Sequence, residues 1–146
     1  MKLPLKTHTI TRILEGAQTK LLLPKYMFDR VLNDVGKSWI DVREPFIIDE
    51  GKLIYRADFG PSREYDWNPG TFMKKEQVRL KVKLGTFHLI PIQDLTIDEI
   101  KCLGLKSKEE LIREWNRDLP KVKRQEFVYK KNPCVYLVSM EVQHEQ

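Results

Sequence analysis

Apolar and polar residues alternate along several short segments of the chain, and this alternation predicts β-strands. It is strictest over 77–84, where apolar residues alternate with basic ones. Successive side chains of a strand point to opposite faces, so one face of this segment is predicted to be buried and the other solvated. Weaker patterns predict strands over 38–44, 87–92 and 134–142, with a turn at Gly85.

A hairpin is predicted where two apolar segments, 46–48 and 53–55, flank the turn-forming residues Asp49, Glu50 and Gly51. The stretch 60–70 is rich in Gly, Pro, Asn, Asp and Ser and is predicted to be a long surface loop. Such loops in compact domains are often functional.

Helical spacing and capping pairs predict short helices. Apolar residues recur at helical spacing over 7–16, and Gly16 is a natural helix end. Thr96 with Glu99, and Ser107 with Glu110, have the spacing of a capping box and predict two short helices around Gly104. Three further segments complete the expectation: 18–23 is extended, 26–32 is a short helix or a packed loop, and 121–124 is a basic linker.

These elements predict a single α+β domain spanning 1–146. Strands and helices do not alternate regularly, which argues against a doubly wound parallel sheet and favours an α+β or barrel arrangement. No apolar run approaches the roughly 20 residues of a membrane span, so no membrane association is expected. Cys102 and Cys134 are not spaced as a metal knuckle and fit a reducing compartment, which favours the cytoplasm.

Lys and Arg outnumber Asp and Glu by 26 to 21, giving a formal net charge of +5. This excess favours polyanions without requiring them. Two segments concentrate it, and each is either a solvated face or a phosphate-binding surface. The first consists of Lys74, Lys75, Arg79, Lys81 and Lys83, and the second of Lys121, Lys123, Arg124, Lys130 and Lys131. Neither a metal site nor a cofactor site is expected, because the three histidines are scattered and no Gly-rich phosphate loop occurs.

The order of several short motifs resembles ASCH domains of the phage and prophage type, which belong to the PUA-like superfamily. The resemblance covers nearly the whole chain. Its residues are Ile13-Leu14-Glu15-Gly16, Gly36, Val42-Arg43-Glu44-Pro45-Phe46, Trp67, Met73, Arg79, Leu95-Thr96-Ile97-Asp98-Glu99, Gly104, Trp115 and Asn132-Pro133. The resemblance implies a PUA-like small β-barrel with short peripheral helices and a cleft that handles RNA or a modified nucleoside.

The chain departs from the ASCH signature at the positions that carry chemistry in some small members, which resemble amidohydrolases of acetylated cytidine. The resemblance assigns Lys, Thr and Glu to that reaction, and these positions hold Gln18, Leu21 and Leu103 here. Gln cannot act as a nucleophile or base, and Leu offers no hydroxyl or carboxylate, so no catalytic residue is expected. Lys20 is a poor substitute, because a one-residue step along a strand reverses the side chain.

A binding module for RNA or a modified nucleoside is therefore the leading hypothesis. Its candidate contact residues are Thr19, Lys20, Arg43, Glu44, Tyr65, Trp67, Lys74, Lys75 and Arg79. Adjacent strand residues face opposite ways, so at most one of Arg43 and Glu44 is expected in the cleft, and Glu44 is preferred. Glu44 could instead form a structural ion pair, and Tyr65 and Trp67 could stack on bases or close the end of the barrel.

Two alternatives stay open. One is a nucleoside hydrolase or ribonuclease with a rearranged site that uses Glu44, Lys20, Tyr65 or Arg79. The other is a phage protein that binds a host protein. A fold supports many functions, so the pattern alone does not choose among them.

Overall fold

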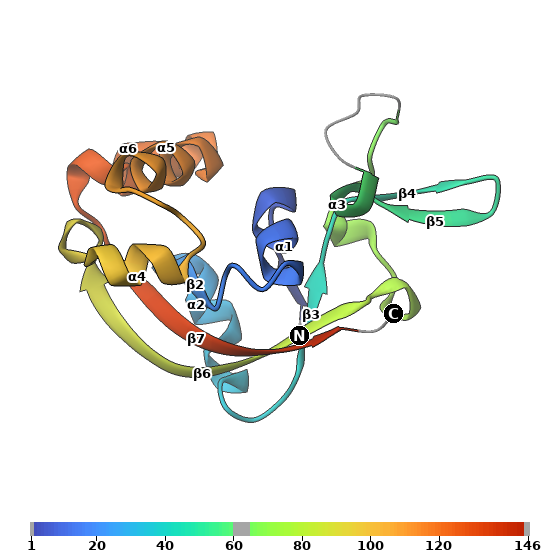
Figure 1. Cartoon of the computed structure of the whole chain (residues 1–146), viewed down its shortest axis with the longest axis horizontal. Helices are drawn as coiled ribbons and strands as arrows, with labels where there is room; N and C mark the ends of the chain where they lie inside the picture. The colour runs from blue at the N-terminus through green and yellow to red at the C-terminus, as the bar shows by residue number, and fades with distance from the viewer. Residues whose placement is uncertain (1, 60–64, 145–146) are drawn as a thin grey trace.

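The structure is a computed structural model of the whole chain, in which residues 2–59 and 65–144 are described. It has the α+β class predicted from the sequence (Figure 1). A five-stranded mixed sheet has the order β1 (Lys2–Pro4), β3 (Ile40–Arg43), β6 (Leu80–Pro91), β7 (Cys134–His144) and β2 (Lys20–Pro24). β1 and β3 run parallel, and the other neighbours are antiparallel. Within the described residues β1 and β2 are the two edges, and no ladder closes the sheet into a ring.

The two long strands β6 and β7 form a bent ribbon that runs the length of the molecule (Figure 1). The predicted turn at Gly85 is wrong, because the strand continues through this point as a β-bulge between Leu84 and Phe87. The bulge adds one residue, so Leu84 and Phe87 lie on the same face although they are three positions apart. A Cβ at Gly85 would lie 2.8 Å from the Ser139 hydroxyl oxygen, so glycine permits this close approach.

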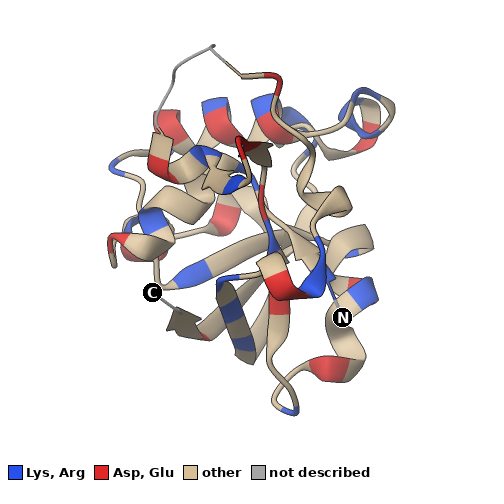
Figure 2. Ribbon diagram, turned by 90° about the vertical axis from the view of Figure 1, so that its right-hand side faces the viewer, with Lys and Arg blue, Asp and Glu red and all other residues tan. Residues whose placement is uncertain are grey.

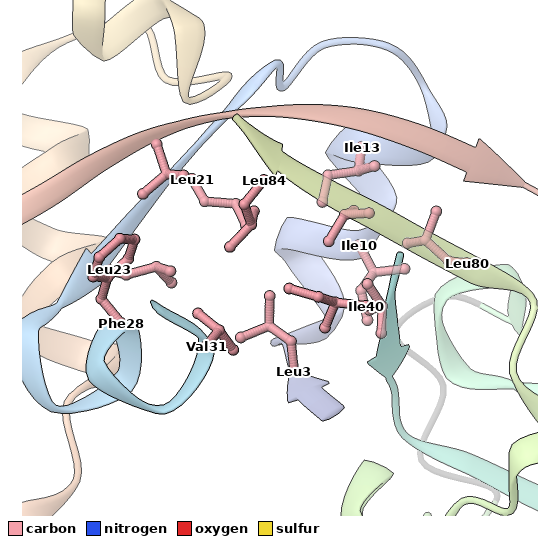
Figure 3. Close-up of a cluster of buried hydrophobic side chains, with 13 residues drawn as sticks. Leu3, Ile10, Ile13, Leu21, Leu23, Phe28, Val31, Ile40, Leu80 and Leu84 are labelled. Carbon is pink, nitrogen blue, oxygen red and sulfur yellow. The ribbon is translucent and has the colours of Figure 1, made fainter. Parts of the chain in front are cut away.

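The main core lies between the sheet and two helices, α1 (Thr7–Leu14) and α2 (Lys25–Val31). The segment predicted as either a helix or a packed loop is therefore a helix. Figure 3 shows this cluster, in which Ile10 and Phe28 have no exposed surface. The other buried members are Leu3, Ile13, Leu21, Leu23, Val31, Ile40, Val42, Leu80, Val82, Leu84 and Val138.

A second core lies on the opposite face of β7, where the side chains of Val135 and Leu137 are buried. It is covered by the helices α4 (Ile97–Cys102) and α5 (Lys108–Asp118), which follow a short 3₁₀ turn, η4 (Ile92–Asp94). The predicted capping box is complete at Thr96, whose hydroxyl oxygen accepts from the Glu99 amide while the Glu99 carboxylate accepts from the Thr96 amide. At Ser107 the hydroxyl oxygen accepts from the Glu110 amide, but the Glu110 carboxylate accepts from the amide of Lys106 instead. These side chains satisfy amides that would otherwise lack partners at a helix start.

The predicted basic linker is wrong, because its residues form a helix, α6 (Lys121–Phe127), that begins after Pro120. Proline fixes the backbone dihedral angle φ in its allowed range just before the first helical turn, where a missing amide donor costs little. A 3₁₀ turn, η5 (Tyr129–Lys131), connects α6 to β7 through Asn132 in a left-handed conformation. The many charged residues of this segment suggested a linker, but its partly buried Phe127 packs on the second core and belongs to a helix.

The predicted hairpin is confirmed as β4 (Phe46–Asp49) and β5 (Lys52–Tyr55), followed by α3 (Arg56–Phe59). Two 3₁₀ turns, η2 (Gly70–Phe72) and η3 (Lys75–Gln77), lead back to β6, which begins at Leu80. Val78 therefore precedes the strand and belongs to a third small core with Phe46 and Met73.

Earlier in the chain, a 3₁₀ turn, η1 (Leu32–Asp34), follows α2 and leads toward β3.

Part of the predicted loop over 60–70 lies outside the described residues, at 60–64. Its C-terminal part is held by a β-bridge between Asn68 and Phe46. None of the described helices combines the length and the apolar character needed to cross a membrane.

Candidate nucleic-acid interface

The positions at which the sequence departs from the expected catalytic residues, Gln18, Leu21 and Leu103, are built into the protein interior. Gln18 is only 5 % exposed; its side-chain oxygen accepts from the Arg12 Nε at 3.0 Å, and its amide nitrogen donates to the Lys20 carbonyl at 2.9 Å. Leu21 and Leu103 are buried in the main and second cores. The three positions thus serve packing and local hydrogen bonding. Thr19 is exposed and Lys20 half-buried, so of this segment only these two candidates reach solvent.

A network of charged side chains joins α1 to α5 beside Gln18. Arg12 donates from its two terminal nitrogens to both oxygens of Glu114, at 2.7 and 2.8 Å. His8 Nε2 lies 2.8 Å from the Asp118 Oδ2. Burial raises the pKa of Asp118, but the hydrogen bond and charge of His8, with the charge of Arg117, outweigh it and lower the pKa overall. Sequence reasoning missed this network, although His8 and Arg12, like Glu114 and Asp118, are spaced four apart on a helix.

His8, Glu114 and Asp118 bring potential metal ligands within 4.8 Å of one another. Both carboxylate oxygens of Glu114 are, however, engaged by the guanidinium of Arg12. A cation would have to displace a bidentate, charge-assisted interaction and would be repelled by Arg12 and Arg117. The arrangement is therefore explained as a helix-to-helix clamp.

Glu44 and Arg79 form a buried ion pair, the structural alternative considered for Glu44. Arg79 donates from Nε and Nη2 to the two oxygens of Glu44, at 3.1 and 2.9 Å, and from Nη1 to Asp58 at 2.6 Å. Its guanidinium also lies 3.9 Å from the centre of the Tyr55 ring. Glu44 has no exposed surface, and this burial raises its pKa, while the bond and charge of Arg79 limit the rise. These contacts occupy both side chains within the protein.

Arg43 is buried as well, so both residues of the Arg-Glu pair lie inside the protein. β3 ends at Arg43, and Glu44 follows it. Glu44, the residue expected to reach a cleft, is buried instead. Arg43 donates to the Met73 carbonyl and lies 3.8 Å from the Asp41 carboxylate. In this conformation neither Arg43 nor Glu44 presents a surface to a polymer.

Tyr65 and Trp67 pack against each other and against Phe59, with ring centres between 5.1 and 5.7 Å apart and edge-to-face geometry. The Tyr65 hydroxyl donates to Asp49 at 2.8 Å, which ties the loop to the hairpin. Both rings are half-buried. Packing against each other and against Phe59 thus explains the position of both rings. Part of each ring stays accessible for stacking.

The basic residues around the start of β6 are partly balanced by acids. Arg79 is engaged by two carboxylates, Lys81 pairs in register with Asp41, and Lys83 pairs with Glu141. Opposite charges directly across a ladder attract each other. Figure 2 views the molecule from this hairpin end and shows positive and negative segments interleaved. Lys74 and Lys75 remain exposed, and Lys75 borders a shallow depression of about 360 Å³ with Glu76, Val78 and Lys81.

The second basic segment differs, and we name it the α6–η5 basic surface. It comprises Lys121, Lys123, Arg124, Lys130 and Lys131. Glu126 is the only acidic residue between Asp118 and Glu141. Within the described part of the chain, none of these five cations has a carboxylate within 4.0 Å.

An aromatic ring borders the α6–η5 basic surface. The ammonium of Lys123 lies 4.9 Å from the centre of the Tyr26 ring, which also meets Phe127 edge-to-face at 5.5 Å. Tyr26 and Phe127 are half-buried. The surface thus combines unpaired cations with an accessible ring, the two components by which proteins hold single-stranded nucleic acids.

No family model, no curated protein and no solved structure matches this chain.

Proposed function

We propose that this chain is an RNA-binding module of the PUA-like type, related to ASCH domains, and that its α6–η5 basic surface contacts the phosphates. The observation that carries the proposal is the set of five cations with no carboxylate partner among the described residues. Cations that are already paired inside a protein release few counterions when a polyanion binds, whereas unpaired ones release their full share.

The choice between the two basic segments follows from the same reasoning. At the start of β6, Arg79 would have to leave two carboxylates, and Lys81 and Lys83 lie beside acids on neighbouring strands. On the α6–η5 basic surface, Lys121 and Lys130 need give up nothing except water. Lys74 and Lys75 supply a secondary contact for a longer strand in this proposal.

Tyr26 supports single-stranded RNA as the ligand class. Its ring lies 4.9 Å from the Lys123 ammonium, and a base stacked on an aromatic ring contributes roughly 1 to 3 kcal/mol. A single strand can present an unstacked base to this ring while its phosphates meet the lysines, and a duplex cannot.

In this proposal the bent ribbon of β6 and β7, with β1, β2 and β3, is the PUA-like barrel in an open form, and the protein acts in the cytoplasm. The burial of Gln18 and Glu44 gives no support to a nucleoside-binding cleft at these residues, so the proposal rests on a polymer bound at the outer α6–η5 basic surface. It also gives no support to the hydrolase alternative, because Glu44 is held by Arg79.

The proposal is tested by fluorescence anisotropy with a labelled oligouridylate of about 12 nucleotides, within the usual site size of such modules. Binding is measured over a series of KCl concentrations for the unmodified protein and for the triple variant Lys121→Gln, Lys123→Gln, Arg124→Gln. Each lost phosphate contact is expected to reduce the steepness of the log-log salt dependence by about 0.7.

The matched control removes three exposed lysines that lie outside both basic segments: Lys37→Gln, Lys52→Gln and Lys106→Gln. It carries the same change in net charge, so a general field effect would weaken binding equally in both variants. A larger loss of affinity and of salt slope in the α6 variant supports the proposal. Absence of binding at low salt, or equal losses in the two variants, contradicts it.

A further inference from the structure

One stretch of β6 is an open sheet edge. β3 pairs with β6 only at Val82 and Lys81, and the amide of Gly36 then bonds to the Leu84 carbonyl at 2.7 Å. Beyond Leu84, no described strand pairs with β6 on that side. In Figure 1 this half of β6 runs along the outside of the ribbon.

The open edge carries no Lys, Arg, Asp or Glu, although 32 % of the chain is charged, and its one histidine, His88, lies 3.4 Å from the Glu99 carboxylate. Its sequence is Thr86-Phe87-His88-Leu89-Ile90, and it ends at Pro91. Phe87 is 43 % exposed and Leu89 is 51 % exposed. Sheet edges of native proteins are usually protected by charges, prolines or a covering element, so an uncharged and apolar edge points to a partner strand.

The direction of the free main-chain groups follows from the register. Because the Leu84 carbonyl points away from β7, the Leu84–Met140 pair is one that exchanges no hydrogen bonds. Such pairs recur at every second position along β7, so Phe87, opposite Val138, and Leu89, opposite Tyr136, belong to the same class. The N–H and C=O groups of Phe87 and Leu89 therefore point outward, without a strand to receive them.

This pattern is its own complement. If a second copy lies antiparallel with a two-fold axis through His88, Phe87 of each copy faces Leu89 of the other. Each of these two pairs can exchange both main-chain hydrogen bonds, which is the geometry of an antiparallel ladder. The two His88 residues then face each other as a non-hydrogen-bonded pair, and the Phe87 and Leu89 side chains of the two copies meet on one face.

We propose that the protein forms a symmetric homodimer through this edge, with a two-fold axis through His88. The second copy is the occupant because the edge matches itself in main-chain polarity and in apolar side chains. The ladder spans only 86–90, since the bulge at Gly85 and the missing amide of Pro91 end it on either side. The dimer does not depend on RNA binding.

The position of the axis is tested by cross-linking. Cys102 and Cys134 are free, so both are first replaced by serine. In that background His88→Cys places two thiols at a non-hydrogen-bonded pair, within reach of a disulfide. The matched control Thr86→Cys pairs with Ile90 of the other copy, so its two thiols lie too far apart. A dimer that forms on mild oxidation with His88→Cys and not with Thr86→Cys supports the register, and equal cross-linking or none contradicts it.

The interface itself is tested by sedimentation equilibrium over about 1 to 500 µM protein, a range suited to interfaces below standard size. Leu89→Lys is expected to weaken the dimer roughly tenfold or more, because two charges enter the apolar contact. The control Ile48→Lys introduces the same charge on another strand at similar exposure, 54 %, and should leave dimerisation unchanged. A monomer across this whole range, or equal weakening by both variants, overturns the proposal.

Hydrogen exchange of the unmodified protein keeps the test independent of whether Leu89→Lys folds. The amides of Phe87 and Leu89 should become more protected as the protein concentration rises. Protection that does not change with concentration speaks against the edge as the interface.

Discussion

The buried pair of Glu44 and Arg79 predicts an asymmetric response to the loss of either partner. If Glu44 is replaced by Gln, Arg79 still donates to Asp58, whose carboxylate is exposed. If Arg79 is replaced by Met, the Glu44 carboxylate keeps its burial and loses the guanidinium that binds both of its oxygens. Arg79→Met should therefore destabilise the protein more than Glu44→Gln.

The expected magnitudes follow from this geometry. Leaving one member of a buried ion pair without its partner costs about 3 to 5 kcal/mol, which is the expectation for Arg79→Met. Glu44→Gln keeps one acceptor for Arg79 and should cost about 1 to 3 kcal/mol, the range for hydrogen bonds to charged groups. The double variant should be more stable than the sum of the two losses predicts, because it leaves no buried charge at position 44.

The stability of Arg79→Met should also depend on pH. Burial raises the pKa of Glu44 above 4.5, and Arg79 limits this rise, so removal of Arg79 raises the pKa further. A carboxyl with a higher pKa in the folded protein binds protons more tightly when folded. Its contribution to the free energy of unfolding is thus largest below pH 4.5 and is lost as the pH rises through the folded-state pKa.

Urea unfolding followed by tryptophan fluorescence, at about pH 5 and about pH 8, measures these effects. The loss of stability of Arg79→Met relative to the unmodified protein should be larger at the higher pH. In the double variant, which has no carboxyl at position 44, this pH dependence should be absent. The reasoning is refuted if Arg79→Met is no less stable than Glu44→Gln, or if its loss of stability is the same at both pH values.

Three further predictions concern packing, topology and chemistry. Gly70→Ala should destabilise the protein by about 1 to 3 kcal/mol, because the new Cβ would lie 2.6 Å from the backbone nitrogen of Glu44. In the same urea experiment, the control Thr71→Ala at the exposed neighbouring position should change the free energy of unfolding by less than about 0.5 kcal/mol. Truncation after Arg124 removes β7, which pairs with both β6 and β2, so circular dichroism should show no cooperative melting, and a sharp transition would count against this topology. The unmodified protein should release no cytidine from acetylcytidine in a chromatographic assay, since Gln18 is engaged and Leu21 and Leu103 carry no reactive group, and appreciable turnover would reveal a site elsewhere.

Local signals in the sequence determined most of the secondary structure. Alternation over 77–84 identified the strand β6, although it begins only at Leu80. The spacing of Thr96 with Glu99 placed a helix start that the cap confirms. These predictions succeed because a strand's alternation and a helix cap depend on residues within a few positions of each other. The same local reasoning failed at Lys121–Phe127, where a dense run of charge masked a short helix held by Pro120 and Phe127.

The partners of the candidate site residues were decided by the tertiary structure alone. Glu44 meets Arg79 across 35 positions, and Arg12 meets Glu114 across 102. No local pattern encodes which charges meet, because the choice depends on how the hairpin, the sheet and the helices pack. The sequence could place a carboxylate after β3 and a cation before β6. Only folding buried Glu44 against Arg79 and left the cations of the α6–η5 basic surface without carboxylate partners in the described structure.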